Sequence, residues 1–190
     1  MSLIPFGFWA ASGAGGGGSA YDLLETTTLA TSASSVTFSG LGSYSDYAHL
    51  QIRGVFKLAV GTLGAFDLYT TLNNDTSGVY ATHRLFGNGT AVTSNSSTGL
   101  SNFTFTDVVP RASASEGFGV GIMDILDFSS TNKQTTIRFL AGAVTSEEKT
   151  VGLFSGLYNS TSAVTQASLF IPGSNLETGS RFSIYGLKGN

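Results

Sequence analysis

Short stretches in which apolar and polar residues alternate constrain the fold of this chain more than any other feature. The clearest of them is Ala48–Phe56, with the sequence AHLQIRGVF. Polar Gln51 and Arg53 alternate there with apolar residues such as Ile52. Because successive side chains of a β-strand point to opposite sides, this period of two predicts a strand with one buried and one exposed face.

Segments of the same kind follow one another from Tyr21 to about Lys188. They are centred on Phe38, Leu68, Leu85, Phe105, Ile122, Ile137, Leu153, Leu169 and Ile184. The stretches between them are rich in Gly, Asn, Asp and Ser, which favour turns, and read LNNDTSG, GNGT, SSTNKQ and PGSN. About eight to ten short strands at near-regular spacing predict an all-β fold, namely an antiparallel, jelly-roll-like β-sandwich.

Two strand pairings within this sandwich are also predicted. The segment GVGIMDILDFSSTNKQTTIRFLAGA has the pattern of one long hairpin. Asp124 and Asp127 fall near its tip, where they would accept hydrogen bonds from turn amides. The final strand lies in RFSIYGLKGN, and we expect it to pair with the first strand, which would bring the two ends of the domain close together.

Charge is scarce in this chain, and Ser, Thr, Gly and Asn take its place. Charged residues make up 11% and the net charge is -3, so no basic excess is present to neutralise phosphates or an anionic membrane surface. We therefore expect neither nucleic-acid binding nor membrane binding. The chain has no cysteine, which excludes disulfides, thiolate metal sites and cysteine nucleophiles.

The first 20 residues differ in composition from the rest. Before a glycine run, Gly13–Gly18, they place the apolar side chains of Leu3, Ile4, Phe6, Phe8 and Trp9. Such side chains are costly to leave in water, and the glycines form a flexible tether. We predict an extended N-terminal arm over residues 1–20 that docks on a neighbour, joined to a sandwich domain over residues 21–190. The alternative is an N-terminal strand folded on its own domain.

Candidate catalytic groups are few and match no motif. His49 and His83 are the only histidines, each within a predicted strand and without the spacing of a metal site. Paired carboxylates could cleave glycosides, and the acidic candidates are Asp107, Glu116, Asp124 and Asp127. Each lies beside a turn or strand end, where acidic residues commonly cap backbone amides. We predict that the protein is not an enzyme and has no catalytic residue, metal or cofactor.

One loop, Asn73–Asp75 in the sequence NNDTSG, carries clustered oxygen atoms of the kind that bind calcium. The same residues form a common turn, in which Asn and Asp side chains accept hydrogen bonds from backbone amides. We favour the turn, and the sequence leaves a weak calcium site open.

Four segments carry a resemblance to a known group of proteins. They are LLETTTLATSASSVTFSGLGSYSDYAHLQIRG, YATHRLFGNGTAV, GIMDILDFSSTNKQTTIRFLAG and GSRFSIYGLKG. In strand pattern and turn residues the chain beyond about Tyr21 resembles small structural proteins of tailed bacteriophages, many of them from cyanophages and marine phages. Members of that group are virion structural, head decoration (cement) or tail-fibre-like proteins. The resemblance brings no catalytic residue with it.

The resemblance and the composition together imply a component of a virus particle. We expect a capsid decoration or cement protein on the virion surface, which binds and stabilises the lattice of the major capsid protein. A low-charge surface offers little repulsion between copies, so we expect a homo-oligomer. The resemblance implies a trimer, because phage accessory proteins of this kind are commonly trimers. The alternative is a tail-fibre or tail-tip module that binds host surface glycans. A secreted carbohydrate-binding domain is a more distant third.

Overall fold

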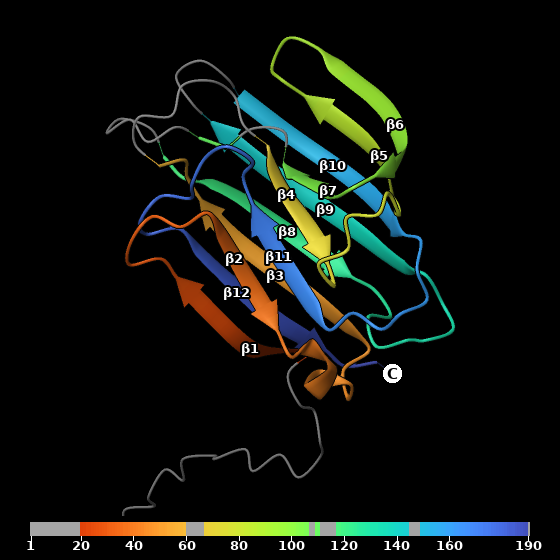
Figure 1. Ribbon diagram of the computed structural model, residues 1–190. Helices are drawn as coiled ribbons and strands as arrows, with labels where there is room; N and C mark the ends of the chain where they lie inside the picture. Colours follow the sequence, from red (N-terminus) through yellow and green to blue (C-terminus); the bar gives the residue numbers. More distant parts are fainter. Residues whose placement is uncertain (1–19, 60–66, 107–108, 111–116, 145–148, 190) are drawn as a thin grey trace, which may run out of the picture.

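The protein folds into two antiparallel β-sheets packed face to face, as a computed structural model shows (Figure 1). The structure describes residues 20–59, 67–106, 109–110, 117–144 and 149–189. All its named elements are strands except η1 (Leu41–Tyr44), a single turn of 3-10 helix. The predicted all-β antiparallel sandwich is thereby confirmed.

The larger sheet has eight strands and the smaller has four. In spatial order the larger sheet consists of β1 (Tyr21–Thr28), β12 (Arg181–Leu187), β3 (His49–Phe56), β8 (Gly119–Ile125), β9 (Thr135–Val144), β10 (Lys149–Tyr158), β5 (Tyr80–Gly87) and β6 (Val92–Leu100). The smaller sheet consists of β2 (Ser35–Ser39), β11 (Gln166–Phe170), β4 (Leu68–Leu72) and β7 (Phe103–Thr106).

The chain crosses between the two sheets at most steps. In the larger sheet, β1, β12, β3 and β8 are neighbours in that order. In the smaller sheet the order is β2, β11, β4 and β7, so each of these strands is consecutive along the chain with its counterpart in the larger sheet. At most steps, successive strands therefore lie in different layers. Two hairpins, β9–β10 and β5–β6, are inserted into this arrangement and extend only the larger sheet.

Both predicted pairings are present. The long hairpin is β8–β9, in which Ile125 pairs with Ile137. The last strand pairs with the first, and Tyr21 lies opposite Leu187. The segment Val92–Leu100, with the sequence VTSNSSTGL, was not predicted as a strand because it lacks apolar alternation. It becomes β6 by pairing with β5 at the edge of the larger sheet.

Aromatic rings lie directly on glycine backbone where the two sheets meet. Gly121 in β8 faces the Phe105 ring of β7, and Gly156 in β10 faces the Phe103 ring of the same strand. A Cβ atom on either glycine would come closer than 3.0 Å to the ring facing it. The short strand β7 can therefore approach the larger sheet only because these two positions carry no side chain.

Phe139 of β9 stands between those two rings. Its ring centroid is 5.9 Å from that of Phe103 and 5.6 Å from that of Phe105. The Phe105 contact is edge-on, with an interplanar angle of 79°, which aligns the positive ring edge with the negative ring face. All three side chains are completely buried, so this cluster fixes where β7 sits over β8, β9 and β10.

A methyl group on either glycine should therefore destabilise the sandwich. We expect Gly121→Ala and Gly156→Ala each to lower the free energy of unfolding by about 1–3 kcal/mol, because the added carbon overpacks a dense core. Urea unfolding, monitored by far-UV circular dichroism, measures the free energy of unfolding of each variant. Gly117→Ala is the matched control, since no atom lies within 4 Å of its Cβ position. Equal stability of all three variants would contradict this account of the core.

Candidate interaction surface

The outward face of the larger sheet carries a continuous group of aliphatic side chains. We call it the aliphatic patch, and it consists of Val55, Leu85, Val92, Val120, Ile122, Leu140, Val144, Val151 and Leu153. Strand register explains its continuity, because cross-strand partners share one face of a sheet. Leu85 pairs with Leu153, Leu153 with Leu140, and Leu140 with Ile122.

These four residues form a row across β5, β10, β9 and β8. Neighbouring strands are about 4.8 Å apart, so the row extends about 14 Å across the sheet. Leu85, Leu140 and Leu153 are 50%, 52% and 47% exposed. An adjacent row contains Val120, Val151 and Val92, and contiguous apolar surface of this kind marks interaction sites in soluble proteins.

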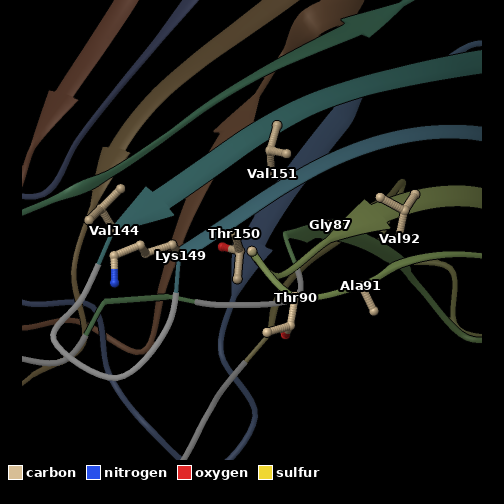
Figure 2. Close-up of a pocket in the computed structure, with 9 residues that line it drawn as sticks. Gly87, Thr90, Ala91, Val92, Val144, Lys149, Thr150 and Val151 are labelled. Carbon is tan, nitrogen blue, oxygen red and sulfur yellow. The ribbon is translucent and has the colours of Figure 1, made fainter.

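A pocket of about 510 Å³ opens at one end of the patch, as Figure 2 shows. It lies between the β5–β6 turn and the start of β10, and Val92, Val144 and Val151 contribute to its lining. Lys149 is the charged residue among its lining residues. The Asn88 Oδ1 atom accepts hydrogen bonds from the backbone N–H groups of Thr90 and Ala91, which holds one wall in place.

A polar network borders the patch one row further along the strands. Asp124 Oδ1 accepts a 2.6 Å hydrogen bond from Gln51 Nε2, and Asp124 Oδ2 accepts one of 3.0 Å from Arg138 Nε. Gln51 Oε1 in turn accepts a 2.7 Å hydrogen bond from Arg53 Nε. The Arg53 guanidinium lies 4.7 Å from the centroid of the Tyr185 ring. This ordered border confines the aliphatic surface to one end of the sheet.

The outward face of the smaller sheet is chemically different. Thr37, Ser168 and Thr71 lie side by side across β2, β11 and β4. The hydroxyl groups of Thr37 and Ser168 share a hydrogen bond of 2.9 Å. Ser168 and Thr71 are also buried, so this row offers less surface than the aliphatic patch for contact with a partner.

The predicted arm residues Leu3, Ile4, Phe6, Phe8 and Trp9 lie outside the described residues, as does the glycine run. His83 is exposed in β5, on the same side as Leu85. His49 accepts a 2.9 Å hydrogen bond at Nδ1 from the backbone N–H of Asp127. Among the described residues no group of three or more His, Cys, Asp or Glu side chains could hold a metal ion.

The two acidic candidates that the structure describes, Asp124 and Asp127, are each engaged by other side chains. Asp107 and Glu116 lie outside the described residues. Asp124 lies within β8 rather than at the hairpin turn, where it was expected, because the strand continues to Ile125. The Asp124 carboxylate accepts hydrogen bonds from Gln51 and Arg138. Asp127 accepts a 3.0 Å hydrogen bond from Lys133 Nζ across the turn.

The NNDTSG loop is a turn whose oxygens bind backbone amides. Asn73 Oδ1 accepts a 2.7 Å hydrogen bond from the Thr165 N–H, and Asp75 Oδ1 accepts one of 2.9 Å from the Ser77 N–H. The side-chain and backbone donors of Ser77 also hold the pKa of Asp75 below its usual value. Asn73 and Asn74 adopt positive φ angles, which Asn tolerates well in turns.

The sequence analysis placed the patch residues other than Val92 in strands without recognising the patch. A signal was present, because IRFLAGAV and TVGLFSGL have apolar residues at both odd and even positions. Phe139 and Leu140 are neighbours in β9, yet one is buried and the other is half exposed. A strand that is apolar on both faces indicates either burial on both sides or an interaction surface.

Comparison of the chain with protein-family models and with curated protein sequences gave no match. In the part of the chain that the structure describes, none of the helical segments has the length and apolarity to span a membrane.

The turn that carries Asn73 and Asp75 also covers a buried tyrosine, which predicts an alkaline limit to stability. The Tyr80 hydroxyl accepts a 2.9 Å hydrogen bond from the Leu72 N–H and lies 2.9 Å from the Asp75 carbonyl oxygen, to which it donates. Its ring stacks on that of Tyr158, with 5.3 Å between centroids. Burial raises the pKa of Tyr80, and burial also raises that of Tyr158.

A raised pKa means that the folded state holds its proton more tightly than the unfolded chain. The resulting stability is fully present below the unfolded pKa of about 10 and is lost as pH rises beyond it. We expect the free energy of unfolding in urea to fall above about pH 10, and Tyr80→Phe to make that fall less steep. The same slope in wild type and Tyr80→Phe would contradict this assignment.

Proposed function

We propose that this chain is a structural protein of a tailed-bacteriophage particle, namely a capsid decoration or cement protein that binds and stabilises the lattice of the major capsid protein. The observation that carries the proposal is the aliphatic patch on the outer face of a low-charge sandwich. Such a surface is costly in an isolated domain and useful in an assembly. The resemblance to phage structural proteins points to the same class.

Burial of the aliphatic patch stabilises an assembly, but stable association also needs further contacts. Covering a half-exposed Leu or Val contributes about 1 kcal/mol, so the whole patch contributes roughly 5–10 kcal/mol. Bringing two proteins together costs about 4–15 kcal/mol in lost translational and rotational freedom. The patch alone is therefore near balance, and stable assembly requires a polar rim, several copies or an additional anchor.

The predicted N-terminal arm is that additional anchor in our proposal. Its apolar side chains, Leu3 to Trp9, would each contribute roughly 1.5–3 kcal/mol if fully buried. Ordering a glycine-tethered segment costs about 1–2 kcal/mol per residue, so the net gain is smaller. Arms exchanged around a symmetry axis bind each copy to the next, which fits the trimer that we expect.

We assign no enzymatic activity, metal or cofactor to the protein. The described acidic residues that could have formed a catalytic pair are engaged in structural hydrogen bonds, as shown for Asp124 and Asp127. Partners in this proposal are other copies of the chain and virion proteins, with no nucleic acid and no membrane. The alternative, a tail-fibre or tail-tip module that binds host glycans, is favoured by a separate feature considered in the next subsection.

Removing aliphatic surface should weaken self-association. We expect wild type to form trimers, and Leu85→Ser with Leu153→Ser to raise the dissociation constant at least about tenfold, since roughly 2 kcal/mol of apolar burial is lost. Sedimentation equilibrium measures the change. Leu23→Ser is the matched control, because Leu23 is comparably exposed on the same sheet but lies at β1, away from the patch. A wild-type protein that stays monomeric at every concentration would contradict the proposal.

Deleting residues 1–18 tests the arm. We expect a soluble, folded sandwich that no longer forms the oligomer or binds the particle, and we expect Phe8→Ala with Trp9→Ala to have most of that effect. Circular dichroism reports folding, and co-sedimentation with phage heads reports binding, with Ser12→Ala as the control. Unfolding of the truncated protein would instead identify the segment as a strand of its own domain. Unchanged binding would place the anchor on the sandwich.

A further inference from the structure

The inserted β5–β6 hairpin creates a second surface, on the inner side of the larger sheet. The edge strand β7 of the smaller sheet contacts β9, β10 and β5, and β6 lies beyond β5 at the end of the larger sheet (Figure 1). Between this extension and the edge of the smaller sheet is a cleft of about 450 Å³. Pockets that bind small molecules usually have volumes of about 300–1,000 Å³.

Two neighbouring strands of the larger sheet, β5 and β6, supply the floor of the cleft. Arg84 of β5 pairs with Asn95 of β6, and the Arg84 Nε atom donates a 2.7 Å hydrogen bond to Asn95 Oδ1. Arg84 also lies opposite Phe154 of β10, whose buried ring contributes to the lining. The hydrogen bond to Asn95 thus helps to hold the guanidinium group in place.

The opposite wall comes from the smaller sheet and the turn that leads into it. Tyr69 of β4 and Thr104 of β7 pair with each other and both line the cleft, together with Asn102 from the turn before β7. The Tyr69 hydroxyl donates a 3.0 Å hydrogen bond to Asp67 Oδ2, which orients its ring. The cleft therefore combines fixed amide, hydroxyl and guanidinium groups with two aromatic side chains.

This combination matches the chemistry of a sugar. A pyranose presents adjacent hydroxyl groups, which both donate and accept, and an apolar face of C–H groups. Asn, Ser and Thr side chains also both donate and accept, and aromatic rings offer apolar surface beside a polar edge. Among the described residues that line the cleft, Arg84 is the single charged group and none carries a carboxylate. Such a lining suits an uncharged ligand better than a nucleotide or a metal ion.

We propose that this cleft binds a neutral, hexose-based oligosaccharide. Arg84 and Asn95 hold the hydroxyl groups of one sugar ring, and the partly exposed Tyr69 side chain covers its apolar face. The proposal is independent of the aliphatic patch, because Arg84 and Leu85 are neighbours in β5 and point to opposite sides of the sheet. It gives the glycan-binding alternative a specific location without requiring that the capsid proposal fail.

The test is binding of defined sugars to the full chain. The probes are maltohexaose, cellohexaose, mannohexaose and chitohexaose, measured by isothermal titration calorimetry at millimolar concentration, with polygalacturonate as an acidic comparison. We expect one neutral probe to bind, and Arg84→Ala and Asn95→Ala each to weaken that binding at least about tenfold, as the loss of one hydrogen bond to a charged or fixed polar group implies. The Arg84→Lys variant keeps the charge but not the planar guanidinium group. Its affinity for the sugar should therefore lie between those of wild type and Arg84→Ala.

The matched controls lie on the same two strands. His83 pairs with Ser96 on the outer face, directly beside Arg84 and Asn95, so His83→Ala and Ser96→Ala should leave sugar affinity unchanged. Absence of binding to every neutral probe, equal affinity of wild type and Arg84→Ala, or preference for polygalacturonate would each overturn the proposal. Leu85→Ser with Leu153→Ser should bind the sugar normally, so failure of the assembly proposal and failure of this one are distinguishable.

Discussion

The packing of aromatic rings against bare glycine backbone is the contact on which the rest of the structure depends. Phe103 and Phe105 of β7 come close to the larger sheet only over Gly156 and Gly121. This arrangement sets how the two layers meet, because the ring of Phe139 fills the space between. A glycine loses more conformational entropy on folding than any other residue, and here the loss is offset by buried aromatic surface.

The position of β7 in turn separates the two candidate surfaces. Since the smaller sheet ends at β7, the β5–β6 hairpin extends beyond it with both faces available. Its outer side continues the aliphatic patch through Leu85 and Val92, and its inner side carries Arg84 and Asn95 in the polar cleft. In our two proposals, one side of this hairpin serves assembly and the other binds a ligand, because side chains alternate between the two faces of each strand.

The sequence predicted well wherever the signal was local. AHLQIRGVF became a strand with the expected faces, although Gln51 is buried by its hydrogen bond to Asp124. The strand Val92–Leu100 was missed because the residues between its two ends are polar or glycine and show no apolar alternation, and its extended form depends on its pairing with β5. Asp124 was expected at a turn, but pairing with β3 and β9 keeps it within a strand.

The sequence by itself determined most of the strands, most of the turns between them, and that the chain carries little charge, because these properties arise from neighbouring residues. Only the tertiary structure decided that Leu85, Leu153, Leu140 and Ile122 form one row, and that Arg84 and Asn95 face a cleft beside Tyr69. Those relations depend on the register between strands far apart in the chain. Register is set by how the whole core packs, and a shift of one residue would move every side chain to the other face.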